Sequence, residues 1–176
     1  DDSKMRLLDS AGTELAEIWG HGDLKREDRH ILDLTEEIIS DAIEQRASDI
    51  LIDPVDDGSY AIRLRVDGVL RRVRQLGVET CRPVINSVKV VATMDISEKR
   101  RPQDGAFMAK SGAMAVAFRV ASAGVVHGEK LAIRVLNRGA ATFKLADVGM
   151  AKSQCAIIER AVRRPSGMLL ICGPTG

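Results

Sequence analysis

The last residues of the chain have the composition and spacing of a phosphate-binding loop. The apolar run Met168-Leu169-Leu170-Ile171-Cys172 leads into Gly173-Pro174-Thr175-Gly176, which matches the first four positions of the pattern GxxxxGK[ST]. In such a loop the backbone N–H groups converge on phosphate oxygens between a buried strand and the next helix. Taken by itself, this short motif is more often an ordinary turn, and the preceding strand-like run is what favours a phosphate-binding loop.

The histidines and cysteines do not form a recognisable metal, disulfide or nucleophilic site. They are His21, His30, His127, Cys81, Cys155 and Cys172. No two cysteines have CxxC spacing, and no histidine has metal-ligand spacing with a cysteine or an acidic residue. These residues indicate a reducing compartment, with the histidines at the surface or in turns.

Charge and hydropathy exclude several classes of protein. The 176 residues include 26 lysines and arginines against 25 acidic residues, so bulk charge does not indicate nucleic acid or an anionic membrane as partner. No apolar run approaches the roughly 20 residues that span a bilayer. Asp1-Asp2 is also unlike the basic start of a signal peptide. We therefore expect a soluble, cytoplasmic chain.

One basic cluster, formed by Arg71, Arg72 and Arg74, has the charge to contact nucleic acid. Aromatic residues make up only 3% of the chain, and none lies beside the cluster, so it lacks a platform on which bases could stack. Charged side chains also protect strand edges from unwanted pairing. A solvated strand edge is the favoured interpretation, and no direct nucleic-acid partner is expected.

The first half of the sequence predicts an amphipathic helix followed by a meander of strands. Apolar residues recur at helical spacing over 31–47, with acidic residues towards the start. Residues 1–28 alternate apolar and polar side chains, which favours a loose hairpin or a linker. The predicted strands are 50–52, 60–66 and 69–76, separated by Asp56-Asp57-Gly58 and Asp67-Gly68.

The second half repeats this plan. A helix is predicted over 83–94, where Pro83 suits a position in the first turn. Helix, strands, helix and strands in this order indicate an α+β fold. The next predicted strands are 106–109, 113–121 and 130–136. A linker at 137–141 then precedes a predicted helix over 151–162 and a strand over 168–172.

Several motifs follow one another in an order that resembles a known family. They are Ala47-Ser48-Asp49-Ile50, then 62–70, 94–105, His127-Gly128-Glu129-Lys130, 145–149 and the final segment 165–176. Over residues 31–176 this arrangement resembles the GspE/PilB/PilT family of type II secretion and type IV pilus motor ATPases. Each motif is weak or moderate alone, whereas their common order is a strong signal.

The resemblance implies a domain organisation. It predicts a PAS-like antiparallel sheet with flanking helices, followed by the first helix and strand of a RecA-like P-loop ATPase domain. The expected limits are 1–28 for the hairpin or linker, 29–137 for the PAS-like domain, and 138–176 for the linker and truncated start of the ATPase domain. The family's subunits form a ring of six, so a hexamer is expected of the full-length protein.

The resemblance also implies which residues contact nucleotide. In the family the PAS-like domain closes over ATP and supplies arginines, which form bidentate, charge-assisted bonds to phosphate oxygens. The corresponding candidates are Arg65, Arg100 and Arg119, with Arg63 and Arg134 behind them, together with Gly173, Pro174, Thr175 and Gly176. For each arginine the alternative is an exposed strand residue or a surface ion pair. ATP and Mg²⁺ are expected in the full-length protein, while this chain alone is expected neither to bind them tightly nor to catalyse hydrolysis.

Departures from the family pattern leave two functions open. Leu51 replaces a common histidine, Ala106 replaces a common basic residue, and Ala121 lies where polar residues usually surround Arg119. The first function is a regulatory and oligomerisation domain, with its own catalytic domain, neighbouring subunits and inner-membrane platform proteins as partners. Such a protein would be cytoplasmic and peripheral at the inner membrane. The second is a non-catalytic, PAS-like docking module.

Overall fold

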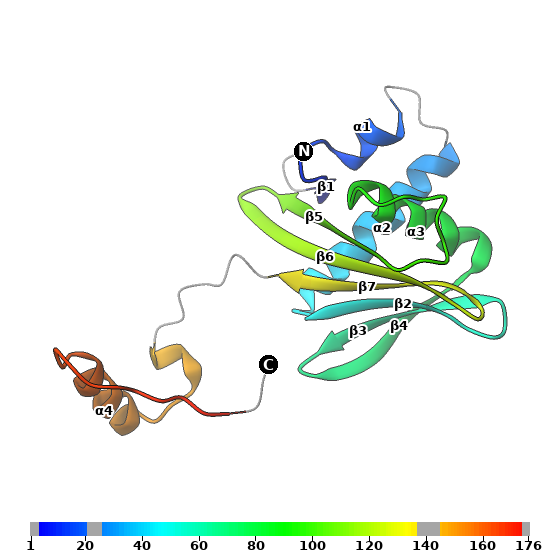
Figure 1. Cartoon of the computed structure of the whole chain (residues 1–176). Helices are drawn as coiled ribbons and strands as arrows, with labels where there is room; N and C mark the ends of the chain where they lie inside the picture. Colours follow the sequence, from blue (N-terminus) through cyan, green and yellow to red (C-terminus); the bar gives the residue numbers. More distant parts are fainter. Residues whose placement is uncertain (1–3, 21–25, 137–144, 174–176) are drawn as a thin grey trace. The chain divides into compact units, whose positions relative to one another are not determined.

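The computed structural model describes residues 4–20, 26–136 and 145–173, and the chain divides into two compact units, 1–139 and 140–176. The first unit is built on an antiparallel sheet of seven strands in the order β1-β5-β6-β7-β2-β3-β4 (Figure 1). Its strands are β1 Arg6–Leu8, β2 Asp49–Pro54, β3 Ser59–Val66, β4 Val69–Gly77, β5 Gln103–Ser111, β6 Met114–Val125 and β7 Gly128–Leu136. With the helices described next, this sheet confirms the predicted α+β fold.

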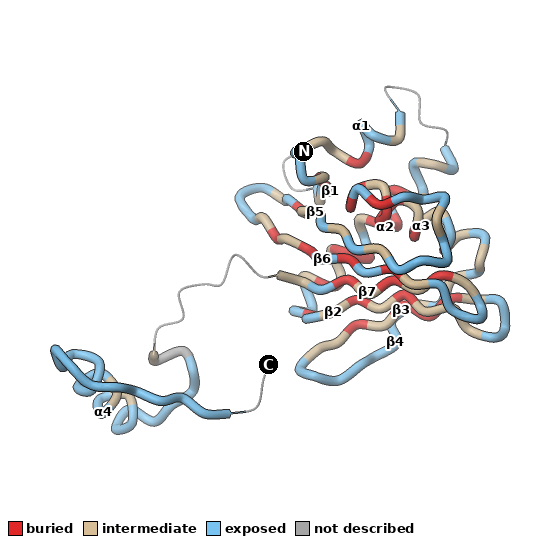
Figure 2. Tube along the Cα trace, in the orientation of Figure 1, coloured by how far each residue is buried: buried red, intermediate tan, exposed pale blue. Residues whose placement is uncertain are grey.

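Helices cover one face of the sheet. The helices of this unit are α1 Leu15–Trp19, α2 Arg26–Glu44 and α3 Val78–Val91. Apolar side chains alternate along the strands, so that Ile50, Ile52 and Leu64 are buried with the helices in one core. Figure 2 shows this burial concentrated on the central strands, α2 and α3, whereas the edge strand β4 is exposed. The opposite, helix-free face of the sheet carries the intervening polar side chains.

Local turn chemistry sets the register of one hairpin. Asp67 and Gly68 join β3 to β4, and both have positive φ angles, 51° and 78°. Positive φ at both central residues defines a type I′ turn, whose twist matches that of the strands it connects. The predicted Asp67-Gly68 turn is therefore present, and it fixes Arg65 opposite Leu70.

The N-terminal segment contains part of the hairpin expected within residues 1–28, because Leu8 and Glu14 form an antiparallel bridge across a turn. The same segment is packed against the core and is not a linker. β1 pairs with β5, and the following helix α1 lies against α3. Leu7 and Leu15 are each only 1% exposed and belong to the main core. The alternation that predicted a hairpin also buries one side of a short strand, because β5 offers it an edge to pair with.

The second helix begins earlier than predicted. α3 starts at Val78, so Pro83 lies inside the helix and not in its first turn. A proline there removes one helical hydrogen bond and is ordinarily costly. Cys81 is fully buried and Val78 packs against the core, so tertiary burial outweighs the local preference.

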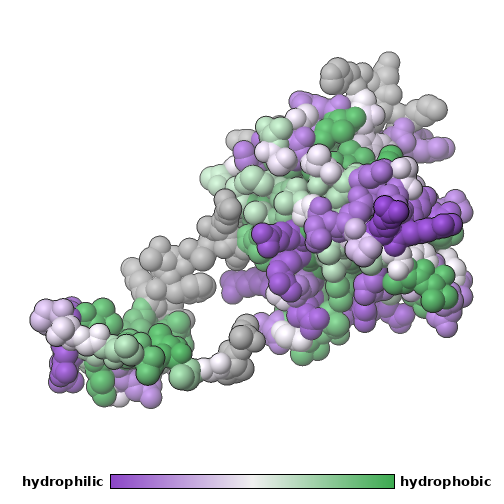
Figure 3. All heavy atoms as spheres, in the orientation of Figure 1, coloured by the Kyte–Doolittle hydropathy of each residue, from purple (hydrophilic) through white to green (hydrophobic). Residues whose placement is uncertain are grey.

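The second unit contains a short 3-10 helix, Leu145–Val148, and the helix α4, Lys152–Val162. The predicted helix over 151–162 is therefore present, whereas the strand predicted over 168–172 is absent. A strand needs a hydrogen-bonded neighbour, and none of the described residues pairs with this segment. Ile171 is 90% exposed, and Figure 3 shows hydrophobic surface along this unit. Among the described helices, none has the length and hydropathy of a membrane span.

Candidate functional site

A row of charged side chains crosses the helix-free face of the sheet. Strand register places Arg119 of β6 opposite Arg134 of β7, Arg134 opposite Asp49 of β2, and Asp49 opposite Arg65 of β3. Ala106 of β5 lies next to Arg119 at the far end. Directly opposed residues on antiparallel strands have neighbouring Cβ atoms, so these side chains form one continuous row. The structure thus brings together Arg65, Arg119 and Arg134 of the predicted site.

Asp49 is the only carboxylate within this row. Arg134 Nε donates to Asp49 Oδ1 at 3.3 Å, and Arg65 Nε donates to Asp49 Oδ2 at 3.1 Å. Ser48 Oγ also donates to Oδ2, at 2.9 Å. One negative charge therefore serves two guanidinium groups, which leaves the row with excess positive charge.

Among the residues that the structure describes, the side chain of Arg119 forms neither an ion pair nor a hydrogen bond. It is exposed and directly opposes Arg134, whose side chain is 71% exposed. Like charges in this position repel one another. An anion with several oxygens could accept hydrogen bonds from both groups and remove that repulsion.

Arg119 and Arg134 line a shallow hollow on this face. Its volume is about 780 Å³, and on this face its lining includes Asp49, Asp104, Ala106, Ala132 and the two arginines. The hollow also reaches Ser10 and the end of α3 at Ala92 and Thr93, so it is not confined to this face. Small alanine side chains leave the guanidinium groups accessible, whereas Asp104 contributes a negative charge at one end. The hollow is large enough for a phosphate group of a bound ligand.

Arg63 lies on the same face but is held in a separate cluster. Its Nη2 and Nε donate to Asp53 Oδ2 at 2.7 and 3.2 Å, and Lys130 Nζ lies 3.6 Å from Asp53 Oδ1. Asp53 follows Asp49 on β2 with its side chain on the same face. The predicted Arg63 is thus an ion-paired residue, in agreement with the alternative interpretation given above for each arginine.

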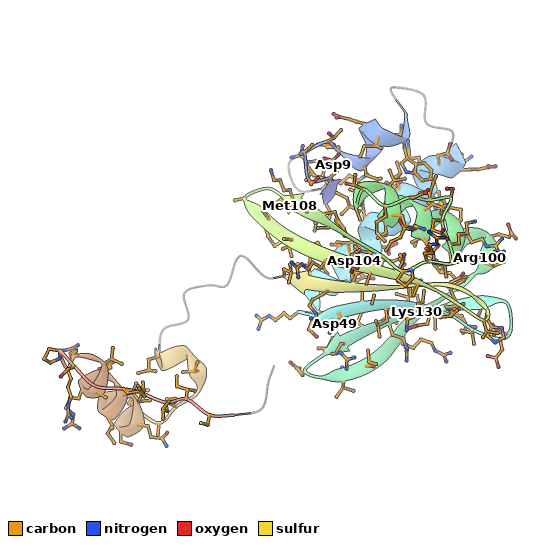
Figure 4. The ribbon with its side chains drawn as sticks, in the orientation of Figure 1. Asp9, Asp49, Arg100, Asp104, Met108 and Lys130 are labelled. Carbon is orange, nitrogen blue, oxygen red and sulfur yellow. The ribbon has the colours of Figure 1, made fainter. Side chains whose placement is uncertain are left out.

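Arg100 lies apart from the row. Figure 4 shows it well separated from Asp49, in the segment between α3 and β5. It lines a different hollow, of about 590 Å³, together with Arg82, Lys99 and Val126. The structure therefore does not join Arg100 to Arg119, although both were predicted to contact the same ligand.

The segment that carries Arg100 is rigidly held. Lys89 is fully buried, and its Nζ donates to the backbone oxygen of Glu98 and to Glu129 Oε1, both at 2.7 Å. The backbone N–H groups of Arg100 and Arg101 donate to the Glu98 carboxylate, which lowers the pKa of Glu98 below its usual value. These contacts fix the backbone from which Arg100 projects.

The basic cluster on β4 is divided between two environments. Arg71 and Arg72 are exposed on this edge strand, as the strand-edge interpretation predicts. Arg74 instead donates to Glu37 and Asp41 of α2, at 2.8 and 2.7 Å. It fastens the helix to the edge of the sheet.

Sequence reasoning missed the role of Asp49. Asp49, Leu51 and Asp53 alternate with buried isoleucines along β2, a pattern that could have placed both carboxylates on one exposed face. Their arginine partners come from other strands and depend on register. Of the predicted loop, Gly173 is exposed, and Pro174, Thr175 and Gly176 lie outside the described residues.

The sequence of the chain matches a known protein family. Residues 25–176 match the family described as type II/IV secretion system protein. The chain therefore belongs to the type II/IV secretion system protein family.

Individual relatives agree with this assignment. The chain is 36% identical to the type II secretion system protein E of Pseudomonas aeruginosa over 152 residues, which is 86% of this chain and 30% of the relative. It is 37% identical to the type IV pilus assembly ATPase PilB of Acinetobacter baylyi over 155 residues, 88% of this chain and 27% of the relative. It is 37% identical to the type II secretion system ATPase E of Vibrio cholerae over 150 residues, which is 85% of this chain and 30% of the relative. The chain thus spans about a third or less of the length of these relatives.

Proposed function

We propose that this chain is the regulatory and assembly part of a secretion or pilus motor ATPase, and that Arg119 and Arg134 bind phosphates of ATP held by a RecA-like catalytic domain. The observation that carries this proposal is the direct opposition of these two arginines on an open sheet face, where Asp49 pairs with Arg134 but not with Arg119. In this proposal residues 29–137 are the PAS-like domain, and 138–176 are the linker and the start of the ATPase domain. The names of the relatives support it, since two of them are ATPases.

The mechanism follows from charge. Without an anion, Arg119 and Arg134 repel one another, and their guanidinium groups remain hydrated. A phosphate between them accepts charge-assisted hydrogen bonds from both, so ATP favours the state in which the sheet face closes on the catalytic domain. Loss of the phosphate weakens this state and lets the domains part.

The other predicted residues receive different roles. Arg65 supports the row through Asp49, Arg63 is held by Asp53, and Arg100 belongs to a separate surface. Gly173 to Gly176 begin the phosphate-binding loop of the catalytic domain. No described group of histidine, cysteine or acidic residues is suited to hold a metal ion, so Mg²⁺ would be held by the catalytic domain and its ATP.

The partners follow from the same proposal. In a hexamer this part of the protein contacts its own catalytic domain and a neighbouring subunit. Contact with inner-membrane platform proteins would hold the cytoplasmic motor at the membrane. The relatives' names, which refer to secretion and pilus assembly, support a role in such a machine.

The alternative function is a docking module without phosphate contacts. It is favoured by the ion pairs that already engage Arg63, Arg65 and Arg134, and by Ala106 beside Arg119. In this case Arg119 would be an ordinary exposed strand residue.

Steady-state ATPase kinetics of the full-length protein distinguish these functions. Arg119→Ala is expected to lower kcat/KM by at least about tenfold, and by on the order of 10³-fold if the arginine acts in the transition state. Arg72→Ala is the matched control, because Arg72 is also an exposed arginine of the sheet but lies on β4, away from the row. Equal activity of both variants, with unchanged melting curves, would favour the docking module.

A further inference from the structure

Asp49 lies between Arg65 and Arg134 and contacts both of them in the same way. Each of its carboxylate oxygens accepts a bond from a different arginine, and both arginines bond through Nε. We propose that Asp49 is a positioning residue, which orients Arg134 so that its terminal nitrogens face the phosphate. This inference rests on the proposed function and adds a residue to its site.

The geometry limits the movement of Asp49 from both sides. Its side chain is only 18% exposed, and Ser48 Oγ donates to the oxygen that also receives Arg65. Arg65 in turn donates through Nη1 to the backbone oxygen of Gly68, at 3.3 Å. A continuous set of contacts therefore runs from the Asp67-Gly68 turn through Arg65 and Asp49 to Arg134.

Because Asp49 accepts from Nε of Arg134, the terminal N–H donors of this arginine stay available for a ligand. A guanidinium carries five N–H donors, and only one of them is at Nε. Asp49 therefore fixes the base of the group, while neither terminal nitrogen of Arg134 has a partner among the described residues. Two terminal nitrogens in one plane are the arrangement that binds phosphate oxygens in a bidentate manner.

An exposed arginine needs such support. The side chain of Arg134 is 71% exposed, and Arg119 opposite repels it. Without Asp49, Arg134 would turn away from Arg119 towards solvent. With Asp49, it stays in the row, so that a phosphate meets an orientation already prepared for it.

The negative charge of Asp49 and its proposed positioning of Arg134 predict opposite effects on ATP binding when Asp49 is replaced. Asp49→Asn removes a negative charge from the row, so by electrostatics alone ATP would bind more tightly. If Asp49 positions Arg134, the same variant weakens ATP use despite the more positive row. Asp49→Glu separates the effects further, because it keeps the charge but displaces the carboxylate by one methylene group.

Asp53 provides a matched control. It lies on the same strand and face, is equally exposed at 18%, and pairs with Arg63 and Lys130. It has no contact with Arg119 or Arg134 among the interactions of the described residues. Asp53→Asn therefore removes a comparable ion pair without disturbing the proposed phosphate contacts.

The test is steady-state ATPase kinetics of the full-length protein, with melting curves recorded for every variant. We expect Asp49→Asn and Asp49→Glu each to lower kcat/KM by roughly 10- to 100-fold, the size of effect typical of residues that orient a ligand-binding group. Asp53→Asn should change kcat/KM by less than about twofold. Tighter ATP binding by Asp49→Asn, or full activity of Asp49→Glu, would overturn the inference.

A double-mutant cycle separates this inference from the proposed function. If Asp49 acts through Arg134, Asp49→Asn should cause little further loss in an Arg134→Ala background. Full additivity of the two losses would overturn the positioning role. If Arg134→Ala and Arg119→Ala are both silent, the proposed function itself fails. If they reduce activity while both Asp49 variants remain active, only the positioning role fails.

Discussion

Lys89 of α3 and Glu129 of β7 form a buried ion pair, with 2.7 Å between Nζ and Oε1. Lys89 is completely buried, and its second bond, to the backbone oxygen of Glu98, ties the segment that carries Arg100 to the core. Helix, sheet and loop therefore meet at one ammonium group. The pair of Lys130 with Asp53, at 3.6 Å, is partly exposed, and among the described residues it does not bond to the backbone of a loop.

Lys89→Met should destabilise the protein strongly. It leaves Glu129 buried without its cation and removes the bond to the loop, and breaking such a pair costs about 3–5 kcal/mol. Lys130→Met, which breaks a partly exposed pair and leaves Asp53 paired with Arg63, should cost less than about 1 kcal/mol. Urea denaturation followed by circular dichroism measures both. A free energy of unfolding that falls equally for the two variants would contradict the importance of the buried pair.

Glu98 should give the stability a dependence on acid pH. Its pKa is lowered from 4.5, chiefly because the Arg100 N–H donates to the carboxylate. A carboxyl whose pKa is lower in the folded state stabilises the fold above its unfolded pKa, and this contribution is lost as pH falls through the folded value. Glu98→Gln should therefore show a flatter loss of stability below pH 4.5. Denaturation midpoints measured from neutral to acid pH check this, and identical acid profiles for both proteins would refute it.

Leu7→Ala tests whether the N-terminal segment is part of the core. Leu7 is 1% exposed on a strand that pairs with β5, and truncation of such a leucine costs about 2–5 kcal/mol. Leu70→Ala, on the exposed edge strand β4, is the control and should have a smaller effect. If Leu7→Ala is as stable as Leu70→Ala in denaturant, the segment behaves like the linker that the sequence suggested.

Local signals predicted much of the fold. The period-two alternation over 60–66 and the Asp67-Gly68 turn depend on neighbouring residues, and the structure has β3 over Ser59–Val66 and the turn where they were predicted. β1 could not be predicted as a strand, because a segment of only three residues forms a strand only where it pairs with another, here β5. The internal position of Pro83 likewise depends on burial of Cys81, which local preferences do not reveal.

The candidate site was predicted in its residue types but not in its arrangement. Arg119, Arg134 and Arg65 were identified by resemblance, yet their common row arises from the register of non-adjacent strands. The resemblance groups Arg100 with them, although the structure places it at a different hollow. The sequence shows Asp49 only as part of the motif Ala47-Ser48-Asp49-Ile50, because its ion pairs with Arg65 and Arg134 depend on the register of other strands.

The 176-residue chain itself offers a direct test of the arginine row. Arg119 and Arg134 together should bind pyrophosphate weakly, with a millimolar Kd, because the excess charge is exposed and solvent competes for it. NMR titration should show the largest shifts at Arg119, Arg134 and Ala132, which line one hollow, and added salt should weaken binding. The double variant Arg119→Ala/Arg134→Ala should lose these shifts, whereas Arg72→Ala should keep them. Micromolar binding of ATP by calorimetry, or shifts confined to the hollow beside Arg100, would show that the phosphate contacts lie elsewhere.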